Sequence, residues 1–215
     1  MACTEPDGSA CGATQTPPMD AAFFESLYAH SRDPWRFDGS WYEARKRGLL
    51  LASLPSPRYA SAFEPGCATG HLTAELARRC DALHACDASA SAADATRQRL
   101  ESQPHVTVTQ AWLPAGWPAS RTFDLIVLSE FLYYLPQDEQ SAIARASRAS
   151  LRPGGTVVAC HWRHPIEGCA SDGDAVHKLL GRMLALSHTV AVRDADFCLD
   201  VWSDGPSAAA HEGRA

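Results

Sequence analysis

The 215-residue sequence has little of what marks metal-binding, secreted or membrane proteins. Its eight cysteines form no Cys-x-x-Cys pair, the spacing typical of zinc sites and redox motifs. No apolar run reaches the length of a membrane span, and the N-terminus lacks the basic start and apolar stretch of a secretory signal. We therefore expect free cysteines, no metal site, no membrane association and a cytosolic location.

Concentrated positive charge is also missing. The formal net charge is −6, and the longest basic run is Arg45-Lys46-Arg47. Proteins that bind nucleic acids usually carry a concentrated basic surface. The composition therefore favours a small-molecule substrate over a nucleic acid, and we interpret the basic run as the solvated face of a helix.

The chain divides into four segments. Residues 1–18 and 204–215 are predicted to be disordered, because they are poor in apolar residues that could form a core. Residues 19–57 show helical periodicity and are predicted to form a helical cap, and residues 58–203 are predicted to form the core domain. The helices expected in the cap are 20–32 and 40–54.

From Arg58 onward, predicted strands alternate with predicted helices, which indicates a mainly parallel sheet covered on both faces. The run FDLIVLS at 123–129 is nearly all apolar, as expected for a strand buried on both sides. Residues 189–192 and 197–202 flank a short turn and predict a C-terminal hairpin. The helices expected in this region are 71–80, 89–102, 137–150 and 174–187.

The most informative segment is SAFEPGCATGH at 61–71. It reads as a short strand that ends at Glu64, followed by a turn of small residues that leads into a helix. Gly66 and Gly70 allow the backbone to fold closely around a ligand. A dinucleotide-binding turn has another register, since its third glycine, counted from Gly66, would fall on His71. A turn without a ligand is the other alternative, so the segments that follow must decide.

Two more acidic residues lie where later predicted strands end. Asp87 ends the strand 83–87, and Glu130 follows the strand 123–129. Parallel strands bring their carboxyl ends to one edge of the sheet, where ligands bind in open α/β folds. A carboxylate at the position of Asp87 can accept hydrogen bonds from ribose hydroxyls. Together with Glu64, these residues predict a nucleoside-binding site at this edge.

The ordered set of motifs resembles the class I S-adenosylmethionine (SAM) methyltransferases. The acid-x-Gly-x-small-x-Gly turn is similar to their motif I, which cradles the methionine part of the cofactor, and FDLIVLSE, YYL and LRPGG are similar to their later motifs. Three further segments, DPW with YExxK, SEFLYYL, and HWRHP with a later VH, resemble the NodS family. That family N-methylates the deacetylated amino sugar of rhizobial lipochitooligosaccharide signals. The resemblance covers roughly residues 20–200.

The resemblance implies a Rossmann-like, seven-stranded, mostly parallel sheet with helices on both faces and a C-terminal antiparallel hairpin. It implies SAM as cofactor and an amino sugar or similar polar amine as methyl acceptor. Many methyltransferases have an Asp near the adenine amino group where this chain has Trp112, which implies stacking instead. Trp35 either helps to close the pocket or anchors the N-terminal segment. The implied cofactor-binding residues are Glu64, Gly66, Cys67, Ala68, Gly70, Asp87, Ala88, Ala111, Trp112, Ser129, Trp35 and Tyr42.

The predicted catalytic residues are Glu130, His161 and Tyr134. A protonated amine needs a base, and Glu130 is placed to take its proton or to orient it; an acid interacting with a helix dipole is the alternative. His161 ends the fifth predicted strand, and the near-neutral pKa of an ordinary histidine suits proton transfer. Either Tyr133 or Tyr134 is expected to face the pocket. His164, Asp174 and His177 are further candidates for contact with a polar substrate.

Three other functions stay open at this point. O-methylation of a small metabolite would use the same cofactor site. A non-catalytic SAM-binding protein would keep the site without turnover. An oxidoreductase would prefer a nicotinamide nucleotide, and the misplaced third glycine disfavours it. The sequence does not predict the oligomeric state.

Overall fold

Seven strands form one mixed sheet in the computed structural model, which describes residues 19–169 and 171–214. The order across the sheet is β3-β2-β1-β4-β5-β7-β6. Strands β1 to β5 run parallel, and β7 is antiparallel to both β5 and β6. The strands are β1 (Ala62–Pro65), β2 (Leu83–Asp87), β3 (Val106–Gln110), β4 (Phe123–Ser129), β5 (Leu151–Trp162), β6 (His188–Arg193) and β7 (Phe197–Ser203).

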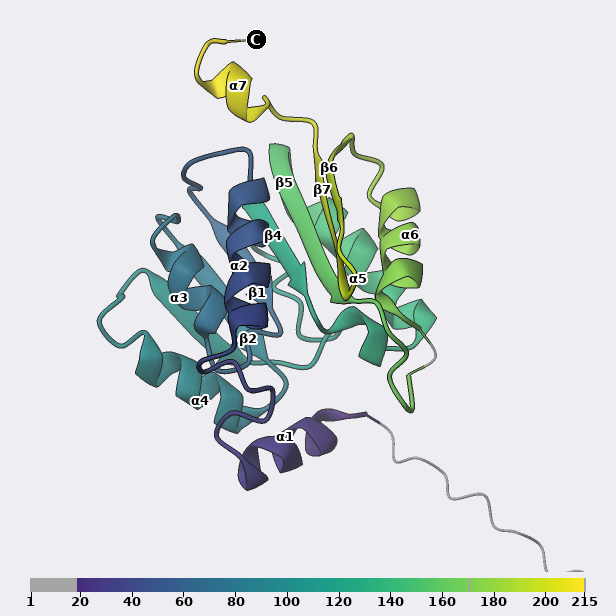
Figure 1. Ribbon diagram of the computed structural model, residues 1–215. Helices are drawn as coiled ribbons and strands as arrows, with labels where there is room; N and C mark the ends of the chain where they lie inside the picture. The colour runs from purple at the N-terminus through teal and green to yellow at the C-terminus, as the bar shows by residue number, and fades with distance from the viewer. Residues whose placement is uncertain (1–18, 170, 215) are drawn as a thin grey trace, which may run out of the picture.

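Helices cover both faces of this sheet (Figure 1). On one face, α2 and α3 pack against Leu125 and Val127 of β4, and on the other α5 and α6 pack against Ile126 and Leu128. This two-sided burial explains why β4 is apolar at nearly every position. The helices are α1 (Ala21–His30), α2 (Trp41–Ser53), α3 (His71–Ala77), α4 (Ala90–Arg99), the short 3₁₀ helix η1 (Leu132–Tyr134), α5 (Gln137–Ser150), α6 (Gly173–Met183) and α7 (Ala208–His211).

The predicted Rossmann-like fold and C-terminal hairpin are confirmed, with differences at element ends. Helix α3 stops at Ala77 instead of continuing to residue 80, because Cys80 pairs with Tyr59 in an isolated parallel bridge. Strand β5 begins at Leu151, because that residue pairs with Phe123 of β4. In both places a pairing partner distant in sequence sets the boundary.

The C-terminal tail corrects the prediction that residues 204–215 are disordered. Ser207 accepts a hydrogen bond from the Ala210 N–H and begins α7, and the side chains of His211 and Ser56 are hydrogen-bonded at 3.0 Å. The three alanines of this helix are strong helix formers, and serine is a preferred N-cap. The predicted N-terminal tail, 1–18, lies outside the described residues.

The carboxyl ends of β1 to β5 meet at the edge of the sheet where α1 lies in Figure 1, while α7 lies at the opposite end. Helix α1 has no buried residue and contacts the beginning of α4 through Glu25. Within the described ranges, none of the helices has the length and apolar character that a membrane span needs.

Candidate active site

The turn after β1 has left-handed backbone at three positions. Gly66, Ala68 and Gly70 have φ angles of 71°, 49° and 79°. A Cβ on Gly66 would lie 3.3 Å from the Phe131 side chain, and one on Gly70 would lie 2.9 Å from Cγ2 of Thr96. Glycine therefore satisfies both the backbone conformation and the close approach, whereas Ala68 adopts a conformation that is unfavourable for residues with a side chain.

Hydrogen bonds to Asp87 hold this turn at the end of β2. Its Oδ2 accepts a hydrogen bond from the Ala68 N–H at 2.8 Å, and its Oδ1 accepts one from the Ser89 N–H at 3.0 Å. The Gly66 N–H donates to the Cys86 carbonyl at 2.7 Å. Burial raises the pKa of Asp87, although the hydrogen bonds from Ser89 and Ala68 oppose that shift. The end of β2 therefore fixes the position of the glycine turn.

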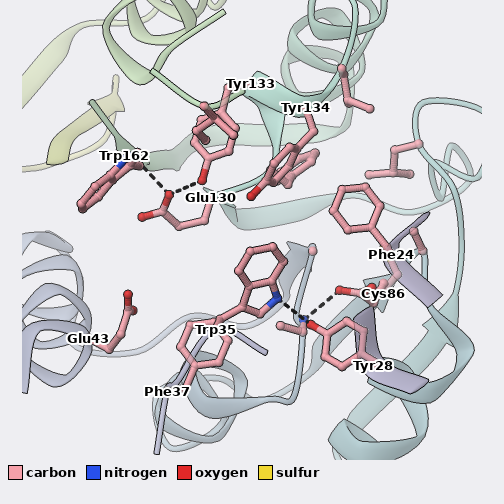
Figure 2. A pocket seen from close by; sticks show the side chains of 18 of the residues that line it. Phe24, Tyr28, Trp35, Phe37, Glu43, Cys86, Glu130, Tyr133, Tyr134 and Trp162 are labelled. Carbon is pink, nitrogen blue, oxygen red and sulfur yellow. Dashed lines mark hydrogen bonds between the residues drawn. The ribbon is translucent and has the colours of Figure 1, made fainter. Parts of the chain in front are cut away.

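A cavity of about 700 Å³ opens beside the turn, within the size range of small-molecule sites (Figure 2). Its walls come from the carboxyl ends of the parallel strands, from α1 and α2, and from the segment between these helices. The structure brings ten of the predicted site residues to it. They are Trp35, Tyr42, Gly66, Ala68, Asp87, Ala88, Ala111, Trp112, Glu130 and Tyr134.

Beyond Asp87, the cavity is mainly apolar. Ala88, Ala111 and Trp112 line it, and the ring centroid of Phe24 from α1 lies 6.5 Å from that of Trp112. Tyr28, one turn further along α1, also lines the cavity, and its hydroxyl accepts a hydrogen bond from the Trp35 Nε1–H at 3.0 Å. Apolar walls of this kind suit a flat ring. The sequence predicts such a site, because Trp112 stands where many methyltransferases have an acidic residue.

At the other end of the cavity, Glu130 is held by three donors. Its Oε1 accepts a hydrogen bond from Lys46 Nζ at 2.6 Å. Its Oε2 accepts one from the Tyr133 hydroxyl at 2.6 Å and one from the backbone N–H of Trp162 at 2.9 Å. Glu130 has a φ of 60°, and η1 begins only after Phe131, so it does not cap a helix. The helix-dipole alternative is therefore wrong, and the carboxylate instead joins α2, β4 and β5.

Lys46 is almost fully buried, with 7% of its surface exposed. Its Nζ lies 3.0 Å from Glu43 Oε1, besides the contact with Glu130. Burial alone would lower the pKa of Lys46, but the carboxylates of Glu130 and Glu43 outweigh it and raise that pKa. Lys46 therefore stays protonated and holds two carboxylates beside the cavity.

His161 corrects one of the catalytic predictions, because the structure places it outside the cavity. It is fully buried, and its Nδ1 is hydrogen-bonded to Nε2 of His177 at 3.0 Å. Burial lowers the pKa of His161 well below its ordinary value. Side chains alternate along a strand, so it is the next residue, Trp162, that lines the cavity. His161 therefore belongs to the core beneath the site.

Both tyrosines of the YYL motif line the cavity, so the expectation that only one faces it is wrong. Tyr133 is buried and reaches Glu130, whereas Tyr134 packs against Phe24 of α1 at a ring distance of 5.1 Å and against Trp35 at 6.4 Å. The difference arises because η1 is a 3₁₀ helix, in which adjacent residues diverge by a third of a turn.

Four predicted cofactor-binding residues lie behind the cavity wall rather than in it: Glu64, Cys67, Gly70 and Ser129. Glu64 is fully buried, and its Oε2 has no hydrogen-bond partner among the described residues. The candidate substrate contacts His164, Asp174 and His177 are likewise absent from the wall of this cavity. His164 instead pairs with Asp196, and Asp174 with Arg163.

Several lining residues were not predicted: Phe24, Tyr28, Phe37, Glu43, Lys46, Phe131, Trp162 and Asp196. The spacing of Glu43 and Lys46, three residues apart on a helix, is a signal that they share a face. No sequence pattern places Asp196, which reaches the cavity only because β7 inserts beside β5. Within the described ranges, no three His, Cys, Asp or Glu side chains are grouped to hold a metal, and the cysteines are free.

A family model described as Nodulation protein S (NodS) matches residues 25–188. The chain belongs to the NodS family. The resemblance found in the sequence is thereby confirmed, and the match runs from α1 to the beginning of β6, so it includes nearly all of the cavity wall.

Curated NodS relatives are identical to the chain at about a third of the aligned positions. Nodulation protein S of Rhizobium tropici is 36% identical over 132 residues, which are 59% of this chain and 53% of the relative. That of Sinorhizobium fredii is 34% identical over 135 residues, which are 60% of each chain. The match thus spans between half and two thirds of these relatives.

Solved structures agree with the NodS assignment. The N-methyltransferase NodS from Bradyrhizobium japonicum WM9, solved with S-adenosyl-L-homocysteine (SAH), aligns with a TM-score of 0.78 at 26% identity, over 86% of this chain and 98% of that one. A putative methyltransferase from Pseudomonas syringae is 46% identical with a TM-score of 0.69, over 76% of this chain and 99% of that one. The methyltransferase fold implied by the motifs is confirmed.

Proposed function

We propose that this protein is a SAM-dependent methyltransferase that methylates a nitrogen atom of a small molecule, an amino sugar or a similar polar amine. The observation that carries this proposal is the cavity that runs from the glycine turn and Asp87 to Glu130, in a chain of the NodS family. The relative solved with SAH supports it, because SAH is what SAM becomes after it has given up its methyl group.

The residues at the turn fit SAM. Gly66 lines the cavity with left-handed backbone, and a Cβ there would take up space beside Phe131. Asp87 lies at the position of the acid that binds ribose hydroxyls in nucleotide-binding α/β folds. Each of its oxygens already accepts one backbone N–H, but a carboxylate has about four lone-pair sites, so it can accept further hydrogen bonds. Trp112 and Ala111 would cover the adenine.

When bound, SAM supplies a methyl group that its sulfonium already activates, so the protein need not polarise it. The chain's task is to align the acceptor and to exclude water. The aromatic walls formed by Trp35, Tyr134 and Trp162 do the second. Alignment of two reactants can contribute up to about 7–11 kcal/mol in favourable cases.

Glu130 fits the role of orienting the acceptor. Three donors fix its carboxylate at the end of β4, on the wall of the cavity. A carboxylate held in this way is a rigid acceptor for an amine N–H. Glu130→Gln should therefore spare cofactor binding and lower turnover, because the amide offers a donor where the amine needs an acceptor.

Calorimetry with SAH, with NAD as the control, tests the cofactor. We expect micromolar binding of SAH and none of NAD, and Asp87→Ala should weaken the binding of SAH. Absence of SAH binding would contradict the proposal, and preference for NAD would favour an oxidoreductase.

Transfer of a labelled methyl group from SAM then tests the acceptor. The amines glucosamine, benzylamine and n-butylamine are compared with the matched alcohols glucose, benzyl alcohol and n-butanol. We expect label on the amines alone. Label on the alcohols would indicate an O-methyltransferase, and SAH binding without any transfer would indicate a non-catalytic SAM-binding protein.

A further inference from the structure

The three carboxylates at the acceptor end of the cavity differ in how they are engaged. Glu130 accepts hydrogen bonds on both oxygens. Asp196 pairs with His164 through Oδ1 at 2.9 Å and leaves Oδ2 without a hydrogen bond from the described residues, but its side chain is 44% exposed and has no contact with Lys46. Glu43 uses Oε1 to accept from Lys46 at 3.0 Å, while Oε2 accepts no hydrogen bond from the described residues. Glu43 lines the cavity near Glu130, so it offers a carboxylate oxygen that is free to meet a ligand (Figure 2).

Lys46 links Glu43 to Glu130. Its Nζ contacts Oε1 of both residues, at 3.0 Å and 2.6 Å, and lies 5.1 Å from the ring centre of Tyr42. A single buried ammonium group thus keeps the two carboxylates close enough for one amine to contact both. Because these carboxylates raise the pKa of Lys46 despite its burial, Lys46 itself cannot serve as the base.

We propose that Glu43 is the catalytic residue that takes the acceptor's proton, that Glu130 is the fixed acceptor that orients the amine, and that Lys46 positions both. This inference rests on the proposed N-methyltransferase function. The sequence predicts that Glu130 takes the proton or orients the amine. The structure separates these two roles, because Glu130 already accepts three hydrogen bonds whereas Glu43 accepts one.

A primary ammonium ion has three N–H bonds and no lone pair, so it cannot attack a methyl group. The carboxylates attract it, while burial, the cation of Lys46 and the sulfonium disfavour its charged form. Glu43 takes one proton, and the nitrogen lone pair then forms the C–N bond as the C–S bond breaks and its electrons stay on sulfur. The product is a protonated secondary amine, and Glu43, whose side chain is 13% exposed, releases its proton to solvent.

Other titratable groups surround Glu43. They are Tyr42 and Lys46 on its own helix, Glu130 after β4, Tyr133 of η1, Cys160 of β5 and Asp196 in the β6–β7 turn. Burial raises the pKa of Tyr133 and of Cys160 well above their ordinary values, so both stay protonated through the working range.

The experiment measures kcat/KM from about pH 6 to about pH 10 with labelled SAM and glucosamine, benzylamine and n-butylamine. At neutral pH, Glu43→Gln should lower kcat/KM by about a hundredfold or more, as expected for loss of a general base. Toward the upper end the loss should shrink, to below about tenfold for the amine with the lowest pKa, because a growing share of the free amine there is already neutral. Glu43→Asp should retain part of the activity. Glu130→Gln should lower kcat/KM by a similar factor at every pH.

The control is Glu75→Gln, since Glu75 also pairs with a cation of α2, Arg47, but lies outside the cavity wall. Its profile should match that of the unaltered protein. SAH binding by every variant shows that each has folded. A Glu43→Gln profile like that of the control, or a pH-dependent loss in Glu130→Gln instead, would overturn the assignment while leaving the N-methyltransferase proposal standing. Transfer to none of the amines by the unaltered protein would overturn both.

Discussion

Glu64 is a residue whose burial has a measurable effect on stability. Burial, reinforced by the nearby carboxylate of Asp87, raises the pKa of Glu64 from 4.5 to about 8. The folded state therefore binds a proton that the unfolded state releases between these pH values. The stability that the bound proton gives to the folded state is fully present below pH 4.5 and is lost as the pH rises through about 8. Between these values the free energy of unfolding falls by about 1.4 kcal/mol per pH unit.

Glu64→Gln isolates this effect, because the amide has nearly the same shape and does not titrate. Urea denaturation of both proteins at several pH values should show the unaltered protein losing stability relative to the variant as the pH rises from 4.5 to about 8. Parallel curves for the two proteins across this range would show that Glu64 has no such shifted pKa.

Gly70 is a residue where space and conformation act together. Its φ is 79°, and an added Cβ would lie 2.9 Å from Cγ2 of Thr96 in α4. Gly70→Ala should therefore cost about 1–3 kcal/mol of unfolding free energy and should also weaken SAH binding, because the turn would shift. Ala68→Gly is the matched comparison: Ala68 has a φ of 49°, so glycine there should retain or increase stability. Equal stability of Gly70→Ala and the unaltered protein would contradict the packing argument.

At the scale of elements, periodicity and apolar runs were enough to predict the strands and helices that depend mainly on their own sequence. Residues 137–150 form α5 over the predicted range, and β4 follows its apolar run. The acceptor end of the site was not predictable in this way. It is assembled by Lys46 reaching Glu130, 84 residues away, and by Trp162 donating its N–H, a contact that does not depend on the side chain. Such contacts are set by tertiary packing, which no local periodicity records.

Asp200 of β7 shows how one side chain can hold several elements together. It is 1% exposed and accepts hydrogen bonds from His177 of α6 at 2.5 Å and from Arg193 of β6 at 2.8 Å. Although burial opposes it, these partners lower the pKa of Asp200 to about 2. The stability that its charge confers is present above the ordinary value of 3.8 and is lost as the pH falls through about 2.

Asp200→Asn should lower the free energy of unfolding by about 3 kcal/mol at neutral pH, because it removes the charge that three donor residues share, His177, His188 and Arg193. Urea denaturation measures the change. Asp94→Asn provides the control, since Asp94 pairs with Arg97 on the exposed surface of α4, where such pairs contribute less than about 1 kcal/mol. A loss no larger in Asp200→Asn than in the control would contradict a structural role for the Asp200 cluster.

At the scale of the whole molecule, the cavity is closed by a helix that has little hold on the core. Helix α1 has no buried residue. Glu25 accepts a hydrogen bond from the Ser89 hydroxyl at 2.6 Å, and the Phe24 ring lies 5.1 Å from that of Tyr134 and 6.5 Å from that of Trp112. Trp112 lines the proposed cofactor region and Tyr134 the proposed acceptor region. A ligand bound between these two residues would therefore add contacts to α1.

Hydrogen exchange should report this coupling. Amides of α1 should exchange rapidly in the free protein and more slowly with saturating SAH, because local opening of α1 would then expose the ligand. Helix α2 is the internal control, since Leu50 and Lys46 are buried and its amides should be protected in both states. Glu25→Gln should reduce the protection of α1 without changing that of α2. Exchange in α1 that is unaffected by saturating SAH would show that this helix does not close over the bound molecule.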